Sequence, residues 1–228
     1  MTETQARDEI CRIGASLFAR GYVHATAGNI SVRLDDGGFL ITPTDACLGT
    51  LDPARIARLD AQLQHIGGDR PSKTMAVHAQ IYHAATRFDP VTGCVIHTHS
   101  THCVALSLDA AAVERARSGH EWLPAITPYF VMKVGHVPLI PYHRPGDPQA
   151  AHLIAKAIAQ QGERGAPIRA VMLERLGPNV WHDTPAAAMA VLEELEETAR
   201  LWLMSQSRPA PLDEAHIDEL RRQFGARW

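Results

Sequence analysis

The chain has 228 residues, of which 46% are hydrophobic, and this is enough for one domain with a sizeable core. Its net charge of -3, with acidic and basic residues spread along the chain, argues against a nucleic-acid-binding protein. No apolar run approaches the roughly 20 residues of a membrane span, and the charged N-terminal region does not resemble a signal peptide. The four cysteines are scattered, mostly in apolar segments, so we expect reduced thiols and a cytoplasmic location.

The apolar pattern of the first hundred residues predicts two helices, a β-hairpin and one buried strand. In chain order these are a helix over residues 4–20, a hairpin of strands 30–32 and 39–41, a helix over 73–86 and a strand over 93–97. The turn of the hairpin is the segment Asp35–Gly38, which ends in two glycines. Ser72 is expected to cap the second helix.

The rest of the chain predicts short strands between longer helices. The expected elements are a strand over 137–140, a helix over 147–162 with Asp147 as its N-cap, a strand over 169–173, a helix over 184–204 and a last helix over 213–224. The acidic run at 193–197 is expected to be a solvated helix face. Helices around non-adjacent strands indicate a mixed α/β layered domain over residues 1–205. Residues 206–228 are expected to form a linker and a helix that packs on this domain or on a neighbouring subunit.

Two histidines lie at the end of the predicted strand over 93–97. Residues i and i+2 of a strand face the same side, so His97 and His99 present their imidazoles together, an arrangement that suits a divalent metal such as zinc. The alternative is a pair of hydrogen-bonded histidines with a structural role. A catalytic zinc normally has three protein ligands and an open position, so a third ligand must come from another segment.

Three other segments offer groups that could hold an anion. These are TAGN at 26–29, TPT at 42–44 and PSK at 71–73. Thr26 and Asn29 provide neutral donors, and Lys73 provides a cation at a predicted helix N-terminus, where the helix dipole favours negative charge. Each segment by itself could be an ordinary turn or cap. Together they predict a phosphate-binding site.

Several motifs together resemble one family. TAGNISVR, ITPT, RPSK, VHAQIY, VIHTHS, VPLIPYHRPGD and AAAMAVLEELEETARLW occur in the order and approximate spacing of the class II aldolase/adducin family, over roughly residues 4–205. The resemblance implies a three-layer α/β/α sandwich around a mostly antiparallel central sheet, and a homotetramer with active sites between neighbouring subunits. It also implies a divalent metal, zinc or alternatively manganese. Within the family the chain looks most like the decarboxylases of 3-oxo-tetronate 4-phosphates, which release carbon dioxide and leave dihydroxyacetone phosphate.

The resemblance assigns roles to individual residues. His97 and His99 match the metal pair of the family. The segments that hold the substrate phosphate in the family correspond here to Thr26, Asn29, Thr44, Ser72 and Lys73. Asp45 stands where many aldolases of the family have a glycine, and Tyr129 lies in the segment that carries an acidic tyrosine. Arg144 is a candidate for binding a substrate carboxylate or phosphate bidentately, with a surface role as the alternative.

Two positions depart from the family pattern. Thr74 stands where the family has its catalytic glutamate, and Leu176 stands where an N-H-G motif supplies the third metal histidine. His143 is the favoured substitute ligand because its loop resembles one that lines the family's pocket, and His182 is the second option. The loss of the glutamate favours decarboxylation over aldol chemistry, because a 3-oxo acid that loses carbon dioxide needs an electron acceptor rather than a base.

The sequence therefore predicts a metal-dependent carbon–carbon lyase that acts on a sugar-acid phosphate. The alternatives are a sugar-phosphate aldolase or epimerase of the same family, or a catalytically altered or non-enzymatic relative of the adducin type. Among the other histidines, His78 is expected in the core or at the pocket edge, and His102 is expected to pack or to face away. His24 and His120 are expected on surface loops from which either could reach a neighbour's pocket.

Overall fold

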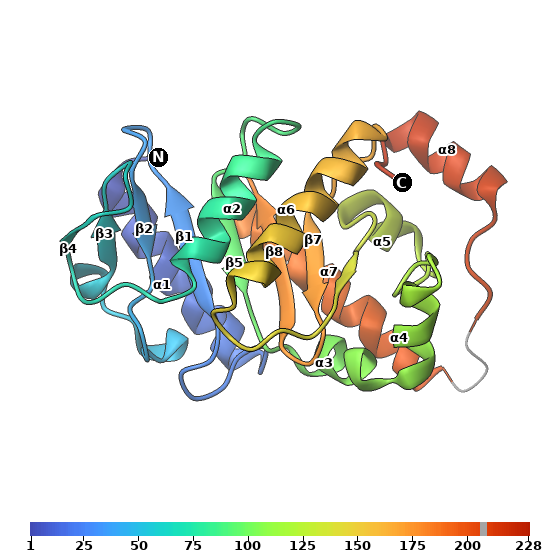
Figure 1. Cartoon of the computed structure of the whole chain (residues 1–228), viewed down its shortest axis with the longest axis horizontal. Coiled ribbons are helices and arrows are strands. Elements are labelled where there is room, and N and C mark those ends of the chain that lie inside the picture. Colours follow the sequence, from blue (N-terminus) through green and yellow to red (C-terminus); the bar gives the residue numbers. More distant parts are fainter. Residues whose placement is uncertain (206–208) are drawn as a thin grey trace.

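The computed structural model of the protein describes residues 1–205 and 209–228, and these residues form one sheet of eight strands (Figure 1). The strands are β1 (Asn29–Arg33), β2 (Phe39–Ile41), β3 (Ala57–Leu59), β4 (His65–Gly67), β5 (Cys94–His97), β6 (Leu139–Ile140), β7 (Ala170–Leu173) and β8 (Gly177–His182). Their order across the sheet is β4-β3-β2-β1-β5-β8-β7-β6. All neighbouring pairs are antiparallel except β6 and β7, so the expected mostly antiparallel sheet is confirmed.

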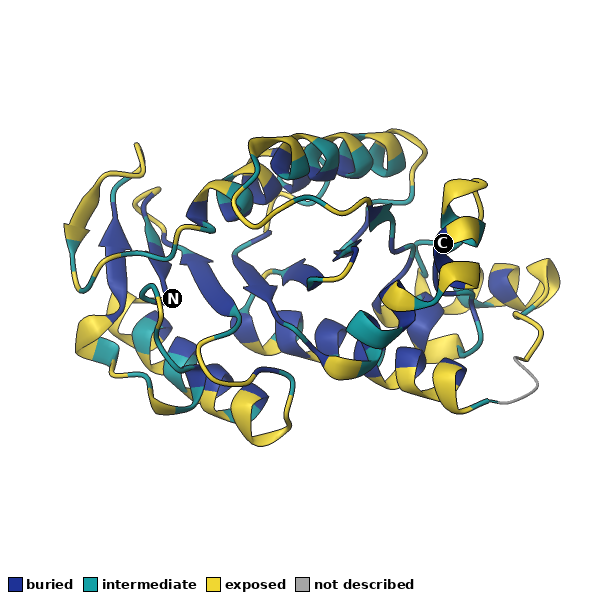
Figure 2. Ribbon diagram, turned by 60° about the horizontal axis from the view of Figure 1, so that its bottom comes forward, coloured by how far each residue is buried: buried dark blue, intermediate teal, exposed yellow. Residues whose placement is uncertain are grey.

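Helices cover both faces of the sheet (Figure 2). One layer contains α1 (Glu3–Ala19), α3 (Thr101–Leu108) and α7 (Pro185–Met204), and the other contains α2 (Met75–Ala85) and α6 (Pro148–Glu163). The alternation along β5 explains the two layers. Ile96 packs in the core under α1 and α7, whereas Val95 packs in the core under α2 and α6. The predicted three-layer α/β/α sandwich is therefore confirmed.

Most helices begin and end close to where the sequence predicts. Asp147 caps α6, because its carboxylate accepts from the backbone N–H of Gln149 at 3.0 Å. Thr184 caps α7 in the same way. The expected cap at Ser72 is wrong: α2 begins at Met75, and the Ser72 hydroxyl bonds the Thr74 hydroxyl at 2.9 Å. The expected strand over 137–140 contracts to two residues because Pro138 has no N–H to donate to a ladder.

Several elements were not expected from the sequence. They are β3, β4, β8, α3, α4 (Ala110–Arg117), α5 (Pro128–Lys133) and two short 3-10 helices, η1 (Leu48–Thr50) and η2 (Pro53–Arg55). The acidic run of α7 is also not entirely solvated, because the Glu196 side chain is buried. It accepts from the backbone N–H groups of His102 at 2.8 Å and Cys103 at 3.0 Å. Glu196 is four residues after the core residue Leu192, and this spacing places both on one face of the helix.

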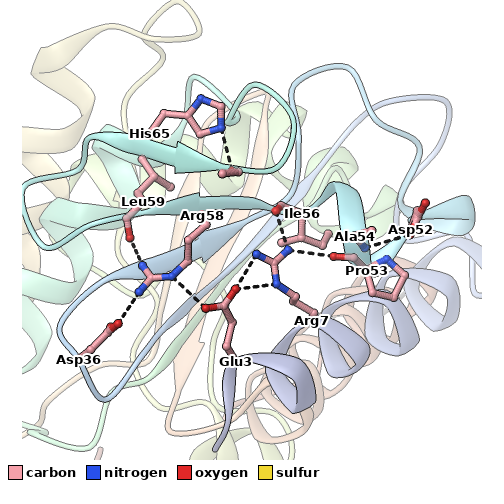
Figure 3. Close-up of polar contacts among 11 residues, drawn as sticks. Glu3, Arg7, Asp36, Asp52, Pro53, Ala54, Ile56, Arg58, Leu59 and His65 are labelled. Atoms are coloured by element: carbon pink, nitrogen blue, oxygen red, sulfur yellow. Dashed lines mark hydrogen bonds and ion pairs between the residues drawn. The ribbon is translucent and has the colours of Figure 1, made fainter.

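A network of ion pairs joins α1 to the far edge of the sheet (Figure 3). Arg58, on β3, is only 9% exposed and bonds the carboxylates of Glu3 and Asp36. Glu3 also pairs with Arg7, whose guanidinium donates to the carbonyl of Ile56 at 2.8 Å. The buried Arg58 and its partners hold α1 against this edge of the sheet. The network lies away from the ends of the central strands.

The C-terminal helix α8 (Glu214–Phe224) packs on the same chain. Ile217 contacts Ala125 and Val131, and the ring of Trp228 stacks on His136 with 4.4 Å between ring centroids. The first residues of the expected linker, 206–208, lie outside the described residues. Within the part of the chain that is described, no helix is both long and apolar enough to cross a bilayer.

Candidate active site

One cavity of about 330 Å³ lies where the central strands end, and it gathers residues from segments far apart in the sequence. It contains every site residue expected from the sequence except Tyr129. These residues are Thr26, Asn29, Thr44, Ser72, Lys73, Thr74, His97, His99, His143 and Arg144. The side chain of Tyr129 is 60% exposed on α5, outside the cavity of the single chain, and its role as an acid stays a prediction.

The two histidines of the H-x-H motif lie together in this cavity. β5 ends at His97, as the predicted strand over 93–97 does, so His99 lies two residues beyond the strand end. The chain nevertheless continues beside β8, because the backbone N–H of Thr98 donates to the carbonyl of Pro178 at 3.2 Å. The ring centroids of His97 and His99 are 5.1 Å apart, and both rings line the cavity.

The surroundings of His97 suit a metal ligand. Its Nδ1 donates to the carbonyl oxygen of Pro178 at 3.0 Å, which leaves the lone pair of Nε2 as the free acceptor of the ring. Burial, followed by the neighbouring His99, lowers the pKa of His97 to about 4, so the imidazole is neutral at neutral pH. Burial also lowers the pKa of His99, and His24 adds to this effect. A neutral and oriented imidazole pair is what a divalent ion requires.

Two asparagines flank His97 on the neighbouring strands. Asn29 lies opposite it on β1, and Asn179 lies opposite it on β8. Both line the cavity, and the buried atoms Asn29 Oδ1 and Asn179 Nδ2 have no hydrogen-bond partner among the described residues. Asn179 is not predicted from the sequence, because Gly177 and Pro178 before it are typical of a turn rather than of the start of a strand.

His78 lies beneath the pair rather than in the cavity. The residue is fully buried, and its Nδ1 and the Ser31 hydroxyl are 2.7 Å apart in a hydrogen bond. Burial, with a contribution from His97, lowers its pKa to about 3. The expectation of a core histidine is confirmed. His102 packs as expected, with its Nδ1 2.8 Å from the carboxylate of Glu196.

Two of the three segments that were predicted to hold an anion meet at the N-terminus of α2. The backbone N–H of Ser72 donates to Thr42 at 3.2 Å, and that of Thr44 donates to Arg70 at 2.9 Å, so the second and third segments form one bridge. Lys73 and Thr74 follow directly, where the dipole of α2 is positive. Asp45 has a φ of +57°, a left-handed conformation in which glycine is least strained.

Leu176 and Thr74, the two positions that depart from the family pattern, both line the cavity. His143 does too, and its Nδ1 is 4.0 Å from the carboxylate of Asp147. His182 is excluded, because it pairs with Cys94 at the opposite end of β5 and bonds Asp183. Over residues 1–205 and 209–228, no three His, Cys, Asp or Glu side chains are grouped closely enough to hold a metal without movement.

Known proteins resemble the chain over most of its length. The family model described as Class II Aldolase and Adducin N-terminal domain matches residues 8–203. The 3-oxo-tetronate 4-phosphate decarboxylase of Cupriavidus necator is 51% identical over 232 residues, which cover 100% of this chain and 99% of that protein.

Two solved structures are also similar to the chain. YgbL from Klebsiella pneumoniae, described as an aldolase/epimerase/decarboxylase, has 40% identity and a TM-score of 0.82, covering 97% of this chain and 100% of its own. An L-fuculose 1-phosphate aldolase, at 22% identity and a TM-score of 0.77 over 99% of this chain and 98% of that one, has the same fold.

Proposed function

The chain belongs to the class II aldolase and adducin family, and from this premise we propose that it decarboxylates a 3-oxo-tetronate 4-phosphate to dihydroxyacetone phosphate and carbon dioxide. It is an enzyme of the carbon–carbon lyase type. The observation that carries the proposal is that the phosphate-binding segments, Arg144 and the histidine pair all line one cavity. The full-length similarity to a named decarboxylase supports the choice of reaction.

The substrate phosphate is proposed to bind at the N-terminus of α2. Lys73 supplies the positive charge, and the hydroxyl groups of Ser72, Thr44 and Thr26 supply neutral donors from three segments. Backbone N–H groups of the first turn of α2 add the favourable end of the helix dipole. This end of the cavity thereby fixes one terminus of the substrate.

Arg144 is proposed to bind the carboxylate at the other end of the substrate. Its side chain is 72% exposed, and its Nε is 3.9 Å from the carboxylate of Asp147, so the guanidinium is free to turn towards a ligand. A planar guanidinium can hold a carboxylate by two parallel hydrogen bonds. Phosphate and carboxylate held apart in this way would leave the ketone between them, near the histidine pair.

The chemistry needs an electron acceptor at that ketone. A divalent ion, zinc or alternatively manganese, held by His97 and His99, would polarise the ketone as a Lewis acid. The bond to the carboxylate breaks, its electron pair stays on the substrate carbon, and that carbon takes up one proton. No proton has to be removed from carbon first, so a threonine at position 74 is compatible with this reaction. Asn179 is proposed to donate a hydrogen bond to the substrate oxygen on which charge develops.

We also propose a homotetramer in the cytoplasm, with residues 1–205 as the catalytic domain and residues 206–228 as a C-terminal appendage. In such an assembly the exposed Tyr129 would belong to a surface that a neighbouring subunit can approach, where its hydroxyl could deliver the proton. Sedimentation of the purified protein measures the number of chains.

A coupled assay tests the reaction. The protein is mixed with a 3-oxo-tetronate 4-phosphate, and dihydroxyacetone phosphate is reduced by an NADH-dependent dehydrogenase while carbon dioxide is measured separately. We expect equal amounts of the two products, and no product from His97→Ala. Cleavage of fuculose or rhamnulose phosphates without any decarboxylation would overturn the proposal.

A second candidate function follows from Leu176 and Thr74. Because both replace groups that take part in family chemistry, the chain could instead be an aldolase or epimerase with altered chemistry, or a relative that binds sugar phosphates without turning them over. Binding of dihydroxyacetone phosphate with no turnover of any sugar-acid phosphate would favour the last of these.

A further inference from the structure

We infer that Glu174 positions the loop that carries Arg144 and thereby makes the site selective for phosphates that also carry a carboxylate. This inference deepens the proposed function and rests on it, since there Arg144 binds the carboxylate of the substrate. Glu174 directly follows β7 and does not line the cavity. Its side chain is only 7% exposed, so it is a buried carboxylate whose partners lie within the protein.

The loop over residues 141–146 forms part of the cavity wall. All of its residues except Tyr142 line the cavity, and the Tyr142 side chain is exposed. In the described part of the chain, only one hydrogen bond joins this loop to a residue outside 141–147. It runs from the backbone N–H of Tyr142 to the carboxylate of Glu174, at 3.1 Å. One buried carboxylate therefore anchors the loop, at the one residue that does not line the cavity.

The backbone of Glu174 binds the same stretch of chain as its side chain does. Its N–H donates to the carbonyl of Ile140 at 3.0 Å, which extends the contact between β6 and β7. The carboxylate then binds the amide of Tyr142, two residues further on. Pro141 lies between these two points and has no N–H to donate. The start of the loop is thus held at two points, the second of them two residues before Arg144.

The arginines near Glu174 do not account for this arrangement. Arg117 of α4 is 3.5 Å from one carboxylate oxygen, and Arg175 is 3.7 Å from the other. Both arginine side chains are more than half exposed, and ion pairs with exposed arginines contribute little to stability. Their charges do balance that of the carboxylate, so Glu174 can lie near the site of an anionic substrate. Among the described residues, the amide of Tyr142 is the only hydrogen-bond donor to this carboxylate.

The other contacts of Arg144 do not hold the loop against the sheet. Its Nε is 3.9 Å from the Asp147 carboxylate, and its carbonyl accepts from the backbone N–H of Asp147 at 3.0 Å, so both contacts lie within one turn. Ordering a loop on ligand binding costs conformational entropy, and a loop that is ordered beforehand binds more tightly. Loss of the Glu174 anchor should therefore weaken binding of the carboxylate by Arg144. Binding of the phosphate near Lys73 depends on other segments and should not change.

Two ligands that differ only at one end make the test. Erythronate 4-phosphate carries the phosphate and the carboxylate but has a hydroxyl in place of the ketone, so it cannot lose carbon dioxide as the proposed substrate does. Erythritol 4-phosphate has an alcohol in place of the carboxylate. Calorimetry measures the dissociation constant of each ligand for the full chain.

The variants separate the hydrogen bond from the charge of Glu174. They are Glu174→Ala, Glu174→Asp, Glu174→Gln, Arg144→Ala, the double variant Glu174→Ala/Arg144→Ala and, as the matched control, Arg117→Ala. Aspartate keeps the charge but is too short to reach the Tyr142 amide, whereas glutamine keeps an acceptor at the same distance. The melting temperature verifies that each variant is folded, and the aspartate and glutamine variants decide the test if the alanine variant is not.

We expect the wild type to bind erythronate 4-phosphate at least about 10-fold more tightly than erythritol 4-phosphate. Glu174→Ala and Glu174→Asp should weaken binding of erythronate 4-phosphate about 10-fold and change binding of erythritol 4-phosphate by less than about twofold. Glu174→Gln and Arg117→Ala should stay within about threefold of the wild type for both ligands. In the Arg144→Ala background, Glu174→Ala should weaken binding by less than about a further twofold, because Glu174 acts through Arg144.

Three results would overturn the inference. The first is an equal loss of both ligands in the Glu174 variants, which would indicate a general structural role. The second is unchanged binding of erythronate 4-phosphate in Glu174→Asp, or in Arg144→Ala. The third is a full additional loss in the double variant, which would show that Glu174 acts independently of Arg144.

The decarboxylase assay gives a separate answer. A wild type that forms no dihydroxyacetone phosphate, with a selective loss of erythronate 4-phosphate in the Glu174 variants, would refute the proposed reaction and leave the role of Glu174 standing. A wild type that decarboxylates, with both ligands bound as tightly by the Glu174 variants, would do the reverse.

Discussion

Asn179 lies directly opposite His97 in the ladder between β5 and β8, so a carboxamide and an imidazole enter the cavity from adjacent strands. Directly opposed residues share a face of the sheet and are near neighbours. His97 is oriented by Pro178, the residue before Asn179, through a 3.0 Å hydrogen bond. One short stretch of β8 thus orients a proposed metal ligand and presents a polar group beside it.

Replacing Asn179 should have opposite effects on stability and on activity. Its buried Nδ2 has no partner in the described residues, and an unpaired buried donor costs about 1–3 kcal/mol. Asn179→Leu is therefore expected to raise the free energy of unfolding in urea by about 1 kcal/mol and to lower decarboxylase turnover at least about 10-fold. Thr98→Val is the matched control, because Thr98 also has an unpaired buried hydroxyl but does not line the cavity. Equal turnover in Asn179→Leu and the wild type would refute the role.

Lys73 should strengthen binding of the substrate through its phosphate. Hydrogen bonds to charged groups contribute about 1.5–3 kcal/mol, so Lys73→Ala should raise KM about 10- to 100-fold and abolish the rise in melting temperature that inorganic phosphate gives. Lys156→Ala, an exposed lysine of α6 outside the cavity, should behave as the wild type does. A normal KM in Lys73→Ala would place the phosphate elsewhere.

Thr74 stands at a position where a carboxylate could act as a base. Thr74→Glu should accelerate exchange of a carbon-bound proton of dihydroxyacetone phosphate in deuterated water by about 100-fold, as followed by NMR, because general-base catalysis contributes about 10²- to 10⁴-fold. Thr74→Gln has a similar side chain without the charge and should not exchange faster than the wild type. If both variants exchange alike, position 74 does not reach the reacting carbon.

Glu196 should be important for stability although it belongs to an acidic run. Its carboxylate accepts two backbone N–H groups at the start of α3 and bonds the His102 ring, so Glu196→Gln should lower the free energy of unfolding by about 1–3 kcal/mol. The adjacent Glu197→Gln alters an exposed residue and should change it by less than about 0.5 kcal/mol. Urea unfolding of both variants makes the comparison, and similar values for the two would contradict the buried role.

The stability of the metal-free protein should fall in acid. The pKa values of His78 and His97 are lowered from 6.5 to about 3 and about 4, so between pH 6.5 and pH 4 the unfolded chain binds protons that the folded chain does not. The free energy of unfolding should then decrease as the pH falls, by up to about 1.4 kcal/mol per pH unit for each histidine. His78→Asn should remove one histidine's share of this slope. Urea unfolding with a chelator at stepped pH measures it, and a flat profile would contradict the burial.

Much of the fold was predictable because its signals are local. The caps at Asp147 and Thr184 combine a side-chain acceptor with a following proline, and both helices begin there. β8 was not predictable, because Gly177 and Pro178 are typical of a turn and only the partners β5 and β7 make the segment a strand. A strand over 137–140 was predicted, but its contraction to Leu139–Ile140, the two residues that pair with β7, was not.

The sequence predicts which segments form the site, but it does not predict how these segments are arranged in space. The H-x-H motif and residues of the three segments predicted to hold an anion line one cavity, as the family resemblance implies. Their neighbours could not be read from the sequence. Whether His24, His143 or His182 approaches the pair depends on strand order and on the path of the loop before β1, and these are set by packing across the sheet. The same holds for Asn179, whose importance depends on register.

Gly28 and the turn before it have a thermodynamic consequence. Thr26, proposed to hold the substrate phosphate, is two residues before Gly28, where a Cβ would be 2.9 Å from the carbonyl oxygen of His97, the proposed metal ligand. A phosphate that orders this turn therefore also restrains the backbone that packs against His97. The ion and the sugar phosphate should therefore bind with positive cooperativity, and by linkage each must tighten the other by the same factor.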